Sequence, residues 1–174
     1  MISLPYFKVD ETVVDPVRKT KGSACFDIAV SLRKDFNLKF WSGRKKNPEQ
    51  YSLIIGEKEV AEGLRLYPDI TYLIPTGVVF DIPEKYHVQI HLRSSTGLKK
   101  HLCIPSHIGI IDSDYVEEVH IPLHILSDAW VTVKNGDFLA QAMLVKNVEE
   151  ELKRVNEKPK QKTSRVGGFG STGN

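Results

Sequence analysis

Apolar and polar residues alternate in short runs along most of the chain, a pattern that is typical of half-buried β-strands. Every second residue is apolar in residues 86–92 and again in residues 119–125. Pro122 lies on the other phase of the second run, which predicts a strand at a sheet edge or with a bulge. Residues 70–83 predict two strands around a Pro-Thr-Gly turn. No long apolar pattern has the helical spacing, so we expect an all-β fold of many short strands.

Two polar segments interrupt this pattern. Residues 33–62 have a mixed composition with one helical turn expected near residues 57–63, and we interpret them as a surface insertion. The alternative is an element that binds a partner or regulates the protein. Residues 149–164 are charged and contain proline, which is typical of a solvated linker. We therefore divide the chain into a β-domain, residues 1–148, and a linker with a glycine-rich arm, residues 149–174.

Composition excludes several classes of protein. A chain of 174 residues with 41% hydrophobic residues suits one soluble domain. A net charge of +2 argues against a nucleic-acid polymer as partner, and the absence of a long apolar run argues against a membrane. Cys25 and Cys103 do not make a disulfide framework, so a reduced, cytoplasmic compartment is expected, or the nucleus in a eukaryote.

Four short segments contain residues suited to chemistry. Residues 109–119 place Asp112 and Asp114 next to Tyr115, and such carboxylates can bind a cation or accept a proton from water. Residues 93–100, RSSTGLKK, supply hydroxyls and positive charge for an anion. A simple turn explains either segment equally well on its own.

Two isolated polar residues also stand out. Asp27 lies in the small, apolar run GSACFDIAV, and Gln141 lies in the apolar run FLAQAMLVKNV. Each could be a structural residue, and Gln141 needs a hydrogen-bond partner if it is buried.

The order of these segments is more informative than any one of them. SACFDIA, RSSTGLKK, GIIDSDY, GDFLAQ and the terminal GGFGSTG resemble the five ordered motifs of the trimeric dUTP diphosphatases, or dUTPases. The resemblance covers nearly the whole chain except residues 33–62 and the linker. It implies a compact β-barrel or jelly-roll-like (β-clip) domain with a short helix and a flexible C-terminal arm. It also implies a homotrimer with active sites between subunits, dUTP as substrate, and Mg²⁺-dependent hydrolysis to dUMP and pyrophosphate.

The resemblance implies a role for each matching residue of the first four motifs. Asp112 would be the general base that directs water at the α-phosphorus, and Asp27 would hold the water shell of Mg²⁺. The phosphates would contact the second and fourth motifs, through Arg93, Ser94, Ser95 and Gln141. Tyr115 would pack under the deoxyribose and exclude a 2′-hydroxyl. The uracil would be bound largely by backbone groups of residues 106–112, including Ser106, Gly109, Ile110 and Ile111, with His120 at the edge.

The fifth motif would form a lid over the substrate. Phe169 would stack on the uracil ring, and glycines would let the backbone close against it. The other lid residues that would contact substrate are Arg165, Gly170 and Ser171.

Several positions depart from the family pattern. The third motif has Glu117 where glycine is usual, and Phe138 stands where the fourth motif usually has arginine. Arg165 comes one residue later than the usual arginine of the fifth motif, and Ser106 stands where asparagine is expected.

Two other functions are compatible with parts of this pattern. The related dCTP deaminases share the RSS motif, but their catalytic glutamate would fall at Pro122, which cannot transfer a proton. Leu98 and Lys99 occupy the region of their second arginine. A binding or regulatory protein on the same scaffold is the other alternative, and residues 33–62 would be its contact.

Overall fold

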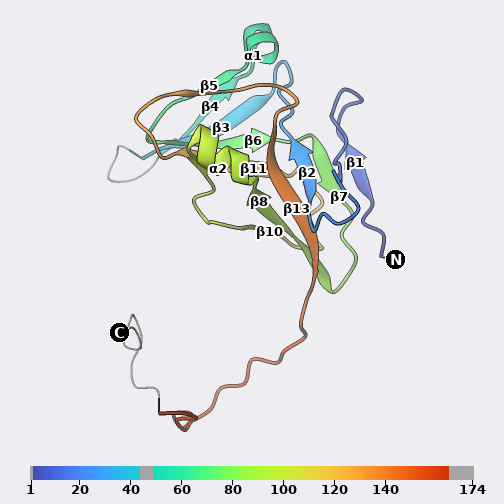
Figure 1. Ribbon diagram of the computed structural model, residues 1–174, viewed down its shortest axis with the longest axis vertical. Helices are drawn as coiled ribbons and strands as arrows, with labels where there is room; N and C mark the ends of the chain where they lie inside the picture. Colours follow the sequence, from blue (N-terminus) through green and yellow to red (C-terminus); the bar gives the residue numbers. More distant parts are fainter. Residues whose placement is uncertain (1, 44–48, 165–174) are drawn as a thin grey trace.

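The computed structural model describes residues 2–43 and 49–164, which form thirteen short strands and two short helices (Figure 1). The strands are β1 (Tyr6–Lys8), β2 (Phe26–Ala29), β3 (Asn37–Ser42), β4 (Gln50–Ile54), β5 (Leu64–Leu66), β6 (Ile70–Pro75), β7 (Val78–Phe80), β8 (Tyr86–Leu92), β9 (Leu102–Cys103), β10 (Gly109–Ile111), β11 (His120–Ile125), β12 (Val131–Val133) and β13 (Phe138–Lys146). The helices are α1 (Glu57–Glu62) and α2 (Ser94–Lys100). The predicted all-β class is confirmed.

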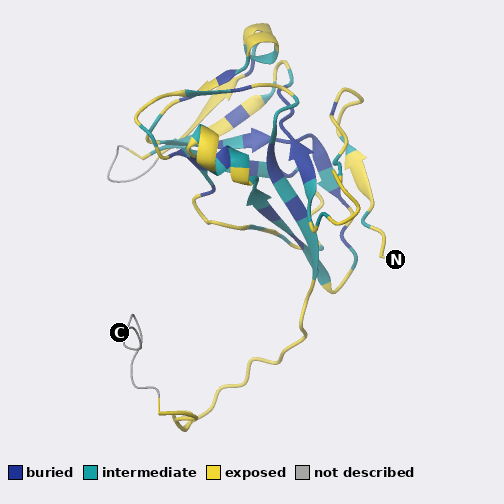
Figure 2. Cartoon of the chain, in the orientation of Figure 1, coloured by how far each residue is buried: buried dark blue, intermediate teal, exposed yellow. Residues whose placement is uncertain are grey.

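Two larger antiparallel sheets enclose one core. Their strand orders are β10-β8-β13-β2 and β4-β3-β6-β11-β9, and the pairs β1-β7 and β12-β5 make two smaller sheets. Buried side chains from both larger sheets belong to a single hydrophobic cluster. Figure 2 shows these buried residues in the body of the domain, whereas α1 is mostly exposed and residues 150–164 are exposed throughout.

The alternating pattern predicted the inward face of both central strands correctly. Val88 and Ile90 of β8 are buried, as are the alternate apolar residues of β11. The neighbours of β11 explain how it accommodates Pro122. β6 pairs with residues 120–124 of β11, whereas β9 pairs only with His124 and Ile125. Pro122 therefore lies where β11 has β6 on one side and has not yet reached β9 on the other, which is an edge-like position suited to a residue without an N–H.

The Pro-Thr-Gly turn separates two sheets instead of closing a hairpin. β6 pairs with β3 and β11, whereas β7 pairs with β1. Gly77 has a positive φ of 71°, and a Cβ atom there would approach Val13 Cγ2 to 2.3 Å. Glycine is required because the chain must turn sharply from one sheet to the other against Val13.

Residues 33–62 are more than the surface insertion that their composition predicts. β3 pairs with β4 and also with β6, so the hairpin extends the five-stranded sheet. Leu38 and Ile55 are fully buried, and α1 follows as the single helical turn that the sequence predicted. Leu38 and Ile55 anchor the segment in the core. The polar average composition of the segment gives no sign of this anchoring.

Helix α2 was not expected from RSSTGLKK. The segment is too short for a helical period to be visible, and it contains Gly97. Its first turn is fixed from outside, because the buried Thr96 donates its hydroxyl proton to the Leu139 carbonyl over 2.8 Å. Tertiary contact with β13 has therefore overridden local preference.

The chain leaves the domain after β13 (Figure 1). His87 Nδ1 lies 2.6 Å from Asn147 Oδ1, and Lys85 pairs with Glu149 over 2.7 Å. Residues 150–164 then run exposed, without helix or strand. None of the described helices is long and apolar enough to cross a membrane.

Substitution of Ile55 tests whether residues 33–62 belong to the core. Ile55→Ala removes a side chain with 0% exposure and should lower the free energy of unfolding by about 2–5 kcal/mol. Ile54→Ala is the matched control. The Ile54 side chain is 57% exposed, so its loss should lower the free energy of unfolding by well under half as much. Urea unfolding of both variants measures the difference, and equal losses would mean that the hairpin is not anchored at Ile55.

Candidate functional site

Strand β13 brings three separate segments together at one place. Gln141 pairs with Asp27 of β2 on one side and with His91 of β8 on the other. Its Nε2 donates a hydrogen bond to the Leu92 carbonyl over 3.1 Å, which supplies the partner that a polar residue in an apolar strand needs. Asp27 and the start of α2 therefore meet across β13.

A hollow of about 340 Å³ lies at this meeting point, and we call it the Asp27 pocket. Its lining includes all five residues that the sequence assigned to the first, second and fourth motifs: Asp27, Arg93, Ser94, Ser95 and Gln141. Lys19 and Cys25, which the motifs did not predict for the site, also line it. The Lys19 ammonium lies 4.3 Å from the centre of the Phe138 ring, and its nearness to the pocket has no local sequence signal.

Arg93 is held in place at the N-cap of α2. Its backbone N–H donates to the Leu139 carbonyl over 3.1 Å, and Nη1 donates to the Phe138 carbonyl over 2.9 Å. Phe138, which stands where the family usually has arginine, thus holds Arg93 through its backbone. A guanidinium anchored in this way still has donors for an anion in the pocket.

Asp27 is buried beside Arg93 without a hydrogen bond to Oδ2. Arg93 Nε lies 3.3 Å from that oxygen, close enough for charge attraction, but their orientation does not make a hydrogen bond. Among the described residues, Asp27 Oδ2 is the buried side-chain oxygen that lacks one. Since a buried carboxylate oxygen normally has a partner, this atom is suited to a cation or to a water molecule bound to one.

Protein ligands alone do not make a metal site here. No group of three or more His, Cys, Asp or Glu side chains in residues 2–43 and 49–164 could hold a metal ion. A single carboxylate fits Mg²⁺, which keeps several water molecules and takes its other ligands from bound phosphates.

The other predicted residues gather at a second place, which we call the Asp112 turn, residues 112–115. Asp112 directly follows β10 and is exposed, and the Tyr115 N–H donates to its carbonyl over 3.2 Å. The Tyr115 hydroxyl donates to the Glu118 carbonyl over 3.1 Å. Burial, together with Glu117 and Glu118, raises the pKa of the Tyr115 hydroxyl, so it stays protonated as a donor near neutral pH.

The strands beside the Asp112 turn position the remaining predicted residues. Gly109 lies against Ile90 of β8, where a Cβ atom would approach Ile90 Cβ to 3.2 Å. Ile110 and Ile111 continue β10, while Ser106 closes the preceding turn by donating to the Ile108 carbonyl over 3.2 Å. His120 begins β11, and its Nδ1 lies 2.8 Å from the Glu118 carbonyl oxygen. The lid residues of the predicted site, Arg165, Phe169, Gly170 and Ser171, lie outside the described residues.

Within one chain, the Asp27 pocket and the Asp112 turn lie apart from each other. Ile111 pairs with Val88 near the start of β8, whereas Arg93 follows the last residue of that strand. The five-residue offset along β8 corresponds to roughly 17 Å at the rise of a β-strand. Each group of residues is assembled within the chain, but the two groups lie at opposite ends of a strand.

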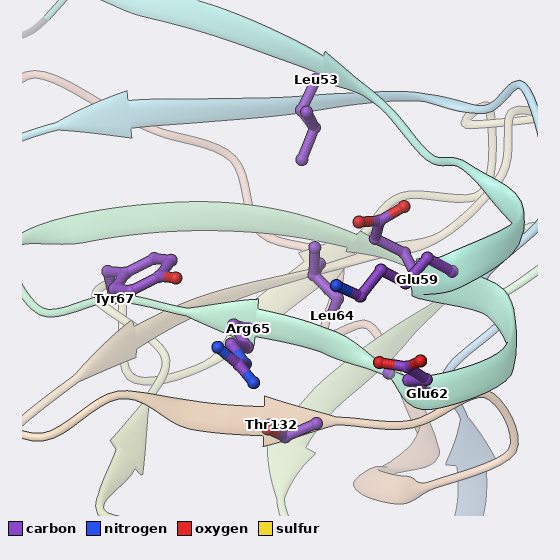
Figure 3. A pocket seen from close by; sticks show the side chains of 9 residues that line it. Leu53, Glu59, Glu62, Leu64, Arg65, Tyr67 and Thr132 are labelled. Atoms are coloured by element: carbon purple, nitrogen blue, oxygen red, sulfur yellow. The ribbon is translucent and has the colours of Figure 1, made fainter.

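A different hollow of about 310 Å³ lies beside α1 (Figure 3). Leu53 of β4, Glu59 and Glu62 of α1, and Arg65 and Tyr67 are among the side chains that line it. None of the predicted site residues that the structure describes belongs to this hollow. We therefore place the candidate site at the Asp27 pocket, where acidic, basic and hydroxyl groups converge.

Comparison with known proteins identifies the family. The dUTPase family model matches residues 59–173. The chain belongs to the dUTPase family. The deoxyuridine 5′-triphosphate nucleotidohydrolase of Leptospira interrogans is 37% identical over 110 residues, which are 63% of this chain and 76% of that relative. The nucleotidohydrolase of the same name from Brucella melitensis is 30% identical over 162 residues, 91% of this chain and 83% of the relative.

Solved dUTPase structures share the fold. The dUTPase of Staphylococcus bacteriophage 80alpha with dUPNHPP has a TM-score of 0.70 at 22% identity, with 100% of both chains covered. The dUTPase from phage phi11 of S. aureus, described with a species-specific insert, has a TM-score of 0.63 at 24% identity and covers 90% of this chain and 98% of its own. This dUTPase therefore has the β-fold that the motifs predicted.

Substitution of Arg93 tests whether the Asp27 pocket binds anions. Arg93→Met removes the guanidinium and should weaken the binding of inorganic pyrophosphate by about 10- to 100-fold, since a hydrogen bond to a charged group is worth about 1.5–3 kcal/mol. Isothermal titration calorimetry measures the affinity. Lys85→Met is the control, because Lys85 pairs with Glu149 on the surface. Equal affinity in the two variants would exclude Arg93 from the anion site.

Proposed function

We propose that this dUTPase hydrolyses dUTP to dUMP and pyrophosphate with Mg²⁺. In a cell it would remove dUTP from the nucleotide pool and supply dUMP for dTTP synthesis, and we propose a cytoplasmic location. The convergence of Asp27, Arg93 and Gln141 on one pocket supports this proposal most directly. These residues come from three distant segments, and a triphosphate requires such a mixture of cationic and hydrogen-bonding groups.

The Asp27 pocket would hold the phosphates. The fixed Arg93 guanidinium and the hydroxyls of Ser94 and Ser95 would donate to phosphate oxygens. Gln141 would orient the same groups through its bond to the Leu92 carbonyl. Catalysis of phosphoryl transfer depends mainly on positioning and charge neutralisation. These residues would therefore contribute by holding the triphosphate in the reactive orientation.

Asp27 would retain the hydration shell of the metal through Oδ2, which accepts no hydrogen bond in the structure. When bound, Mg²⁺ supplies positive charge that neutralises the phosphate oxygens as the reaction proceeds. A dUTPase mutant from phage phi11 is described with a structural Mg(II) ion, which agrees with a metal in this family.

Asp112 would be the general base. Its carboxylate is exposed at the end of β10, where it can accept a proton from a water molecule directed at the α-phosphorus. The backbone of the adjacent turn fixes the aspartate, because its carbonyl accepts the Tyr115 N–H.

The nucleoside would bind beside the Asp112 turn. Tyr115 would pack under the deoxyribose, where its ring leaves no room for a 2′-hydroxyl and so excludes UTP. Backbone groups of Gly109, Ile110 and Ile111 would bind the uracil, with Ser106 and His120 at its edge. Phe169 of the glycine-rich arm would close over the base, with Arg165, Gly170 and Ser171 near the phosphates.

The complete site would be assembled from more than one copy of the chain. The Asp27 pocket and the Asp112 turn lie at opposite ends of β8, roughly 17 Å apart along the strand, and this separation favours a nucleotide bound between two chains. We propose a homotrimer in which one subunit provides the Asp27 pocket and a neighbour provides the Asp112 turn.

Nucleotide selectivity tests the reaction. The protein is offered dUTP, dCTP, UTP or dTTP with Mg²⁺, and pyrophosphate and ammonia are assayed together. Pyrophosphate should appear from dUTP alone, because Tyr115 excludes the ribose and the uracil contacts exclude the other bases. Ammonia from dCTP would replace the proposal with a deaminase, and no reaction with dUTP would favour a non-catalytic role.

Substitution of Asp112 tests the general base. Asp112→Asn preserves the shape of the side chain but cannot accept the proton, so turnover should fall by roughly 10²–10⁴-fold while dUTP still binds. Asp114→Asn is the matched control in the same turn and should keep most activity. Turnover near that of the wild type in Asp112→Asn would assign the base to another residue.

Mixing two inactive variants tests the shared site. Arg93→Met and Asp112→Asn damage different halves, so refolding them together should restore activity at roughly one site in four by random assembly. Each variant refolded alone is the control and should stay inactive. If the mixture is no more active than its components, each site is built from one chain.

A further inference from the structure

Glu118 lies just outside the Asp112 turn, and its carboxylate is fixed by two strong contacts. Oε2 lies 2.6 Å from Arg33 Nη2, and Oε1 accepts the Gly77 N–H over 2.6 Å. The side chains of Arg33 and Glu118 are only 18% and 14% exposed. The end of this exposed loop is therefore held by a largely buried ion pair with the start of residues 33–62.

The backbone of Glu118 in turn holds the side chains proposed for nucleoside binding. Its carbonyl accepts the Tyr115 hydroxyl over 3.1 Å and lies 2.8 Å from His120 Nδ1. The Tyr115 ring is thus tied at its hydroxyl to Glu118 and at its backbone to Asp112. Any shift of Glu118 would move the ring.

Arg33 reaches the same residues by a second route. Its guanidinium lies over the Phe36 ring, 4.9 Å from the ring centre, and Nη1 donates to Ser31 Oγ over 2.9 Å. The Phe36 ring stacks on His120 with 5.9 Å between ring centres. Arg33 therefore supports Tyr115 through Glu118 and supports His120 through Phe36.

We propose that Arg33 and Glu118 are positioning residues that set selectivity for the deoxyribose, an inference that rests on the proposed function. Neither residue touches the nucleotide; they fix the Tyr115 ring at the distance that excludes a 2′-hydroxyl. The loop from Tyr115 to Glu118 has Glu117 at the position where the motif predicts glycine. The ion pair supplies the restraint on this loop from outside the motif.

Kinetics of Arg33→Met and Glu118→Gln with dUTP and UTP test the inference. Each variant should raise KM for dUTP about tenfold and lower the preference for dUTP over UTP about tenfold, with kcat changed by less than about twofold. Arg33→Lys keeps the charge and should recover part of the preference. Tyr115→Ala measures the complete loss of the steric contact.

Lys34→Met is the matched control, because Lys34 is adjacent in sequence but pairs with Glu57 on the surface over 2.7 Å. It should leave both KM values unchanged. The double variant of Arg33→Met and Glu118→Gln should be no worse than Arg33→Met alone, since the two residues act as one unit. If Arg33→Met does not fold, Glu118→Gln decides, because glutamine can still accept the Gly77 N–H.

The outcomes separate this inference from the proposed function. A wild-type protein that releases no pyrophosphate from dUTP overturns the proposed function. An active wild type whose selectivity is unchanged in folded Glu118→Gln overturns the role of the ion pair alone.

Discussion

The pairing of β13 with β8 is the interaction on which the rest of the structure depends. Seven residues of β13, from Ala140 to Lys146, pair in continuous antiparallel register with β8, and β2 covers the other side of β13. This ladder sets Gln141 between Asp27 and His91 and brings the start of α2 against the Leu139 carbonyl. Because the side-chain period of a strand is two, a slip of one residue would turn Gln141 into the core and break the site.

Much of the fold could be predicted from the sequence because the strands alternate. The inward positions of β8 and β11 follow from hydrophobic period alone. Two elements could not be predicted, since tertiary contacts define them: α2 depends on the bond from Thr96 to β13, and the hairpin of residues 33–62 depends on burial of Leu38 and Ile55. Average composition is a poor guide where one or two side chains anchor a segment.

The sequence predicted residues for the candidate site, and the structure shows how those that it describes are arranged. The motifs identified Asp27, Arg93 and Gln141, which the structure brings into one pocket, and Asp112 and Tyr115, which it places elsewhere. A linear sequence gives the order of these residues but not the register of β10 on β8, which sets their separation. Contacts such as Arg33 with Glu118 span 85 positions and leave no local pattern.

Contacts at residues 147 and 149 fix the point from which the C-terminal segment leaves the domain. Asn147 and Glu149 tie it beside His87 and Lys85, at the end of β8 that is near the Asp112 turn. Residues 149–164, fully extended, would span at most about 55 Å, about three times the roughly 17 Å along β8 that separates the two groups of site residues. The length of the linker, residues 149–164, therefore does not dictate which group of site residues the arm could reach. Doubling the number of linker residues would cost only about 0.6 kcal/mol in closure entropy. Contacts therefore fix the point where the segment leaves the sheet, whereas reach alone does not restrict the length of residues 149–164.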